Sequence, residues 1–225
     1  MAIKPMLFNA EMVQAILEGR KTVTRRAVKF KAGWNPKFTG YIPDGDVLYG
    51  SNNIPAVKAP YKAGDVIWVR ETWRIQSAHR FEADAKIEYK SGGPMEKVKF
   101  KCRLDYDRFI WNQPVGEGKW KPSIHMPKEA ARIFLRVIDV RVERLQDITA
   151  EGALDEGTNV EFPEPKPSYI SLAYTEMRLK PAARQSFASL WDSTIKPADR
   201  PRYGWDSNPW VWVIEFERCE KPEGF

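Results

Sequence analysis

The chain has 225 residues, of which 43% are hydrophobic and 29% charged, and this composition predicts one domain spanning 1–225. Its 36 basic and 30 acidic residues give a formal net charge of +6, so a strongly basic tail is excluded. Cys102 and Cys219 are too few and too distant for a disulfide scaffold or a thiolate zinc site, and no segment has the apolar length of a signal peptide or a membrane span. We therefore expect a cytoplasmic protein without membrane contact.

The first predicted unit is a helix, a glycine and a basic strand. Asn9 is the expected N-cap of a helix that places apolar side chains between Met12 and Leu17 on one face. Gly19 stands where a left-handed helix end is expected. The β-branched residues Thr22 to Thr24 then predict an extended chain.

Two segments without sustained periodicity are expected to be insertions, at about 27–60 and 74–127. The first is rich in Gly, Pro and Asn, which is typical of a long connection. Between them, residues 66–69 form an apolar run after a Gly-Asp turn and predict a buried strand. Within the second insertion we expect strands at 85–89 and 98–104.

The C-terminal half begins with the best alternating stretch of the sequence, residues 131–145. Its phase slips near Ile138 and Asp139, which predicts a bulge. A short helix is expected to begin at an N-cap at Thr149 and to end before Gly157.

An amphipathic helix is expected at 182–191 and a closing strand at 210–216. Alternate residues of that strand, Trp210, Trp212 and Ile214, share a face and are expected to lie in the core. Strands with short flanking helices predict an α+β or small-barrel fold rather than a doubly wound sheet.

Four separated stretches carry the most specific signal. They are the G-x-K-x-x-x-x-R run from Gly19 to Arg26, the Gly64-Asp65 turn with its strand, the helix-turn at 148–157, and the closing strand at 211–216. In these four separated stretches the sequence resembles the ASCH family, in particular its longer branch associated with phages and prophages, and the resemblance as a whole extends over about half of the chain.

The resemblance implies an α+β fold, a PUA-like small β-barrel with flanking short helices, carrying the two long insertions. That superfamily often binds RNA or modified nucleotides, so a nucleoside, a nucleotide or RNA is the implied partner. Some small members are similar to amidohydrolases that deacylate 4-acetylcytidine with a lysine, a threonine and a glutamate. By position these match Lys21, Thr24 and Glu156. No cofactor is implied.

Lys21, Thr24 and Glu156 are a chemically sufficient set for this reaction by their residue types alone. Threonine is a weak nucleophile until a base takes its proton, and Lys21 can act as that base only if burial or neighbouring cations lower its pKa. Glu156 would carry the proton to the leaving amine, and Arg26 would steady oxyanion charge. On a regular strand Lys21 and Thr24 face opposite sides, so a shared site requires Lys21 to precede the regular pleat. The alternative is that these residues are solvated charges and a strand-forming threonine.

A second group of candidate substrate-binding residues combines cations with aromatic rings. Arg70, Glu71 and Trp73 follow the strand at 66–69, and Trp120 and His125 lie in the later irregular segment. Rings beside cations suit base stacking and phosphate contact, although tryptophans of this kind also serve as packing. A Glu71–His125 acid–base pair remains open.

The chain contains only two histidines, His79 and His125, so a histidine-based metal site would need carboxylate help. We expect no metal. Basic residues are concentrated between Lys119 and Arg144, which indicates either a strip that contacts phosphate or an ordinary solvated strand face.

Two functions from different classes follow. The first is a nucleotide- or RNA-binding ASCH-type protein that acts as an amidohydrolase on a modified cytidine. The alternative is a module that holds a nucleotide or RNA without changing it, and a ribonuclease using Lys21 and Arg26 on phosphate is a weaker third. The sequence does not indicate an oligomeric state.

Overall fold

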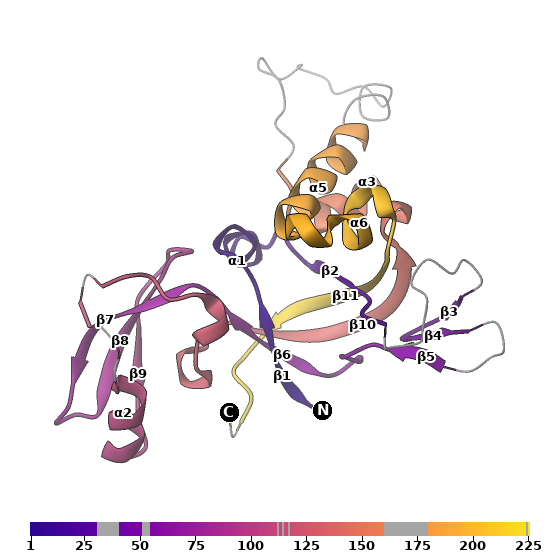
Figure 1. Ribbon diagram of the computed structural model, residues 1–225. Helices are drawn as coiled ribbons and strands as arrows, with labels where there is room; N and C mark the ends of the chain where they lie inside the picture. The colour runs from indigo at the N-terminus through magenta and orange to yellow at the C-terminus, as the bar shows by residue number, and fades with distance from the viewer. Residues whose placement is uncertain are drawn as a thin grey trace. The chain divides into compact units, whose positions relative to one another are not determined.

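The computed structural model describes residues 1–30, 41–50, 55–111, 113, 115–116, 118–159, 180–223 and 225. Within them the chain is a mixed α+β protein in which strands predominate and most helices are short, as expected (Figure 1). The chain divides into two compact units built from discontinuous segments. Unit 1 comprises Met1–Leu17, Asp65–Arg136 and Arg218–Phe225, and unit 2 comprises Glu18–Gly64 and Val137–Glu217.

Unit 1 is organised around β6 (Val66–Arg70), the apolar strand that the sequence predicts. It pairs in parallel with β1 (Ile3–Leu7) and antiparallel with the first residues of β10 (Phe134–Arg144). Four of the five β6 residues are buried, which explains the continuous apolar run. The sequence predicted no strand at β1, because only its pairing with β6 stabilises so short a segment.

A second sheet of unit 1 is an antiparallel meander of β7 (Trp73–His79), β8 (Asp84–Tyr89) and β9 (Glu96–Lys99). It is followed by α2 (Arg103–Ile110), so the strand predicted at 98–104 ends early and a helix takes its place. The helix contributes the buried Tyr106, whose ring meets that of Phe100 at 5.8 Å. The segment from 74 to 127 is thus a structured part of unit 1.

The helix α1 (Ala10–Leu17) begins and ends as predicted. The side-chain Oδ1 of Asn9 accepts a hydrogen bond from the backbone N–H of Met12 at 2.8 Å, which is an N-cap contact. Gly19 follows the helix with a φ of +75°, a conformation that an L side chain rarely adopts.

Unit 2 contains the antiparallel pair of β2 (Val23–Ala27) and β11 (Trp210–Cys219), together with the remainder of β10 beside β11. Trp210, Trp212 and Ile214 are buried, as expected. The alternation of buried residues along β10 breaks at Ile138 and Asp139, which are both exposed. This is the position at which the sequence pattern slips.

Two helices cover one face of this strand pair, α3 (Ala150–Asp155) and α5 (Lys180–Thr194) (Figure 1). Thr149 caps α3 by accepting a hydrogen bond from Gly152 N at 3.0 Å, as predicted. The core between them combines small residues of α3 with rings of α5 and valines of β2 and β11: Val23, Ala150, Ala153, Ala183, Phe187, Trp191, Val211 and Val213. A further short helix, α6 (Arg200–Tyr203), precedes β11.

The segment at 27–60 is not simply an irregular connection. Its described part contains an antiparallel sheet of β3 (Ile42–Asp44), β4 (Val47–Tyr49) and β5 (Pro55–Lys58), while 31–40 and 51–54 lie outside the described residues. Each of these strands has three or four residues, too few for a periodic pattern to show.

The remaining short elements are 3-10 turns. In unit 1 they are η1 (Ser123–His125) and η2 (Lys128–Ala130), and in unit 2 they are η3 (Leu145–Asp147), η5 (Pro197–Asp199) and η6 (Trp205–Ser207). Among the described residues of unit 2, β2 is an edge strand that pairs with β11 alone. No helix of the described segments combines the length and apolar character that a bilayer crossing requires.

Candidate functional site

In unit 2 the chain that leaves Gly19 lies against the end of α3. Lys21 and Glu156 form an isolated antiparallel bridge, and Thr22 N donates a hydrogen bond to Asp155 O at 2.9 Å. β2 begins only at Val23, so Lys21 precedes the strand.

The side chains of Lys21 and Glu156 meet in a buried ion pair. Lys21 Nζ lies 2.5 Å from Glu156 Oε2 and also donates to the Glu156 backbone carbonyl at 3.0 Å. The lysine side chain is 0% exposed and the glutamate side chain 4%. The two predicted acid–base groups, 135 residues apart in sequence, are therefore in direct contact.

Arg25 occupies the second oxygen of the carboxylate. Its Nη1 lies 3.3 Å from Glu156 Oε1, its Nη2 lies 3.6 Å from Glu143 Oε2, and its guanidinium lies 5.9 Å from the centre of the Phe187 ring. The run from Gly19 to Arg26 includes Arg25, but its sequence pattern predicts no contact for it beyond the effect of a neighbouring cation on Lys21. The alternation of Lys21, Val23 and Arg25 would have placed it on the same face as the lysine.

The surroundings of Lys21 change its protonation. Burial lowers the pKa of the Lys21 ammonium below its usual value, Glu156 opposes this by charge and hydrogen bond, and Arg26 and Arg25 lower it further. Burial also lowers the pKa of the half-buried Arg26, against the opposing charges of Glu156 and Tyr61. Lys21 therefore loses its proton more readily than an exposed lysine does.

Thr24 is buried on β2, where it pairs with Ile214 of β11. Since Val23 packs against α3 and α5 and Arg25 reaches Glu156, the pleat directs Thr24 to the opposite face of the strand. Its hydroxyl has no hydrogen-bond partner among the described residues. Two of the three candidate catalytic residues are thus in contact, and the threonine is not bonded to either.

The second candidate group belongs to unit 1 and is considered by itself. The segment after Trp120 lies beside the end of β6. Trp73 and Lys121 exchange backbone hydrogen bonds of 3.2 and 2.8 Å, and the guanidinium of Arg70 donates to the carbonyl of Ile124.

The side chains of this group differ in how far they are exposed. Trp73 is only 1% exposed and belongs to the core of unit 1, so its ring faces are not available to a base. Trp120 is half-buried, with the guanidinium of Arg74 at 4.5 Å from its ring centre. His125 is exposed at the end of η1.

Glu71 pairs with Arg132 rather than with His125. Arg132 Nε and Nη2 lie 2.9 and 3.0 Å from the two carboxylate oxygens, and the Ser91 hydroxyl donates to the same group. A buried carboxylate held by a two-point guanidinium contact is satisfied structurally. Arg132, which belongs to the basic stretch from 119 to 144, is therefore internally neutralised.

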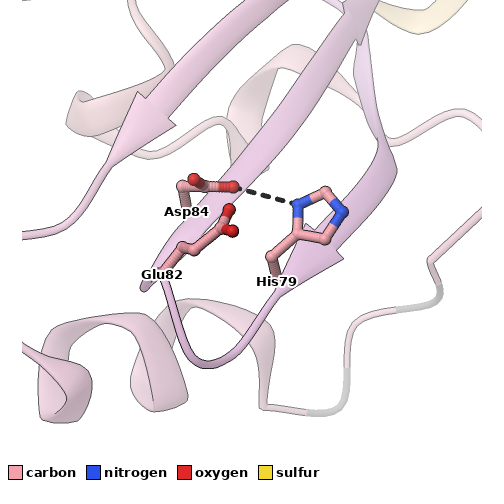
Figure 2. A group of neighbouring side chains, drawn as sticks. All are labelled: His79, Glu82 and Asp84. Atoms are coloured by element: carbon pink, nitrogen blue, oxygen red, sulfur yellow. Dashed lines mark hydrogen bonds and ion pairs between the residues drawn. The ribbon is translucent and has the colours of Figure 1, made fainter.

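One group in unit 1 has the donor types of a metal site. His79, Glu82 and Asp84 lie around the turn between β7 and β8, and one potential ligand atom from each lies within 4.8 Å of the others. Figure 2 shows the three side chains converging, with His79 Nδ1 3.0 Å from Asp84 Oδ1.

The same carboxylate is already compensated by a cation. Lys97 Nζ lies 2.8 Å from Asp84 Oδ2. The hydrogen bond from Lys97 is the main reason that the pKa of Asp84 lies below its usual value, and burial partly opposes it. The ammonium competes with any cation for this carboxylate, so the group is best described as an ion-pair cluster at a hairpin end.

Both cysteines are free, with Cys102 exposed and Cys219 half-buried. Comparisons of the chain with protein-family models, with curated proteins and with solved structures found no match.

Proposed function

We propose that unit 2 binds a nucleoside, a nucleotide or RNA at the Lys21–Glu156 pair and hydrolyses an acyl-amide on a modified cytidine. The observation that carries this proposal is the direct contact of a buried amine of lowered pKa with a buried carboxylate. The resemblance of four stretches to the ASCH family supplies the substrate class and the PUA-like barrel as the proposed architecture.

The proposed reaction assigns one proton movement to each group. Neutral Lys21 takes the proton of the Thr24 hydroxyl as its oxygen attacks the acyl carbon. The C–N bond to the cytosine amine breaks, and that amine receives its proton through Glu156. Water then hydrolyses the acyl ester on Thr24, while the charge of Arg26 stabilises the oxyanion in both steps.

The position of Thr24 decides between two versions of this chemistry. Because the pleat turns Thr24 away from the face of Arg25, a water molecule activated by Lys21 is the alternative nucleophile. The acid–base roles of Lys21 and Glu156 are the same in both versions, so the two are separated by replacing the threonine alone.

A second candidate function is binding without chemistry. It is favoured by the observation that Lys21 and Glu156 satisfy each other and that Arg25 occupies the remaining carboxylate oxygen. A closed ion-pair cluster of this kind is also what a purely structural or ligand-holding role would require.

The test is incubation of the purified chain with 4-acetylcytidine and with a short RNA containing it, followed by mass spectrometry. Lys21→Ala should lower the rate by about 10²- to 10⁴-fold, the usual contribution of a general base. Lys29→Ala is the matched control, because Lys29 is an exposed lysine of the same unit. A product that forms equally with Lys21→Ala contradicts the proposal, and binding without product supports the second candidate.

Thr24→Ala separates the nucleophiles. Loss of activity assigns the attack to the threonine, whereas retained activity that still depends on Lys21 assigns it to water. Circular dichroism of each variant shows whether unit 2 remains folded.

A further inference from the structure

Unit 2 contains a hollow at the opposite end of β2 from Lys21. It has a volume of about 500 Å³, within the range of sites for small ligands. Its wall combines the segment after β2, the last residue of β10, α6 and the start of β11, and includes Val28, Phe30, Arg144, Arg202, Tyr203 and Trp210.

The wall of this hollow carries positive charge without compensation from its own residues. Arg144 and Arg202 line it, and the described residues of its wall include no aspartate or glutamate; Asp147, outside the wall, is the carboxylate whose charge acts on Arg144. Two guanidinium groups around a concave surface attract an anion, and their planar donors match the oxygens of a phosphate or carboxylate.

Arg144 is held in place before any ligand arrives. Its Nη1 donates to the backbone carbonyl of Asn208 at 3.2 Å, and its guanidinium lies 4.2 Å from the centre of the Trp210 ring. Asn208 is itself fixed, since its side-chain Oδ1 accepts from Gln146 N at 2.8 Å. Among the described residues this is one hydrogen bond for a group with five N–H donors, so donors remain for a ligand.

A second, independent observation comes from the indole of Trp210. The residue is 7% exposed, and its Nε1–H is buried without a hydrogen-bond partner among the described residues. Buried donors without an acceptor are rare in folded proteins and indicate a missing partner.

The remaining wall is aromatic. Phe30 and Tyr203 line the hollow together with Trp210, and Arg202 lies 5.1 Å from the centre of the Tyr203 ring. Rings and guanidinium planes are the surfaces on which nucleobases stack. The guanidinium of Arg144 covers one face of Trp210 and Tyr41 stacks on Phe30, so Tyr203 and the other ring faces of the wall are the surfaces for a base, beside the charge for a phosphate.

We propose that this hollow is a nucleotide-binding site, with Arg144 and Arg202 on the phosphate and the aromatic wall on the base. The inference does not depend on the chemistry proposed for Lys21. Trp210 O accepts from Val28 N at 2.9 Å at one end of β2, whereas Lys21 precedes the other end, roughly 20 Å away at the rise of a strand. The nucleotide is either free or part of an RNA chain.

Titration calorimetry on the full chain tests the proposal with cytidine 5′-monophosphate, cytidine, inorganic phosphate and a single-stranded RNA hexamer. We expect the monophosphate to bind more tightly than either cytidine or phosphate alone, because only it uses both parts of the wall. If only the hexamer binds, and binding depends on Arg202, the nucleotide belongs to an RNA chain.

The decisive variant is Arg202→Ala, because Arg202 is exposed and its loss leaves the core intact. Affinity should fall about tenfold or more, as for loss of a charge-assisted contact. In the hexamer titration the salt slope should fall by about 0.7. Arg200→Ala is the matched control, since Arg200 belongs to the same helix but does not line the hollow.

Tyr203→Leu removes one ring of the aromatic wall and leaves both guanidinium groups, so it should weaken binding without abolishing it. The proposal is overturned if none of the four probes binds, if Arg202→Ala binds as the wild type does, or if Lys21→Ala alone abolishes binding.

Discussion

Replacement of Glu156 by glutamine tests the buried charge cluster most directly. The substitution keeps the shape of the side chain and removes the charge that compensates both Lys21 and Arg25. Removing one partner of a buried ion pair costs about 3–5 kcal/mol, because the remaining charge is left in a medium that solvates it poorly. For a chain of this size the loss corresponds to a fall in melting temperature of about 6–20 °C.

The pH dependence of this loss of stability distinguishes an uncompensated charge from poor packing of the glutamine side chain. Burial already lowers the pKa of folded Lys21, and Glu156 is the group that raises it, so Glu156→Gln lowers it further. When the pKa of a lysine is lower in the folded state than in the unfolded state, the unfolded state binds its proton more tightly. Folding is then disfavoured at any pH at which the unfolded lysine is protonated. The variant should therefore recover up to about 1.4 kcal/mol per pH unit as pH rises toward the ordinary lysine pKa.

Urea unfolding between pH 7 and 10, followed by circular dichroism, measures both effects. Glu18→Gln is the matched control, since Glu18 pairs with Arg20 at 2.6 Å but 47% of its side chain is exposed. That variant should change stability by less than about 1 kcal/mol. Equal losses for the two variants, or a Glu156→Gln loss that does not change with pH, would refute the reasoning.

Three further predictions concern local contacts within one unit or the other. Asn9→Ala removes the N-cap of α1 and should cost about 1 kcal/mol in urea unfolding, with Asn9→Gly costing only a few tenths; equal costs would mean that the side-chain contact contributes nothing. Gly157→Ala places a Cβ at a φ of +80° after α3 and should cost roughly 1–2 kcal/mol, unlike an alanine at an exposed helical site. Because Lys97 keeps the pKa of Asp84 low, the stability that this carboxylate contributes is present above pH 4 and is lost as pH falls through its folded pKa. Asp84→Asn should therefore weaken unit 1 at pH 7 and reduce its acid sensitivity in hydrogen exchange, and an unchanged acid profile would contradict the ion pair.

Elements with strong local signals were predictable from the sequence. The helix α1 has the N-cap Asn9, and Gly19 after it adopts a left-handed conformation that favours glycine. In α3 the same two roles belong to Thr149 and Gly157. Local hydrogen bonds and backbone sterics fix such ends, so residues within one or two turns determine them.

Elements that depend on distant partners were missed. The helix α2 has no side-chain cap at Cys102 and only one buried residue, Tyr106, so it lacks both signals that identify a helix. The strand β1 is stabilised by its parallel register with β6, which lies about sixty residues later and leaves no trace in its own composition.

The candidate site shows the same division. Lys21 was identified from a motif, but its contact with Glu156 joins two segments that no local pattern connects. For Glu71 the sequence leaves open an acid–base pair with His125, yet its partner is Arg132, because a buried carboxylate requires a compensating cation. Arg202 and Trp210 were not identified as a pair, since they converge only when α6 meets the start of β11.

The two contacts of Lys21 Nζ have a consequence for the shape of its surroundings. One acceptor is the carboxylate of Glu156 and the other is the carbonyl of the same residue. An uncharged amine still donates hydrogen bonds, so the contact with the carbonyl oxygen persists after the proton has left. Lys21 can thus gain and lose a proton while the main chain beside it stays where it is.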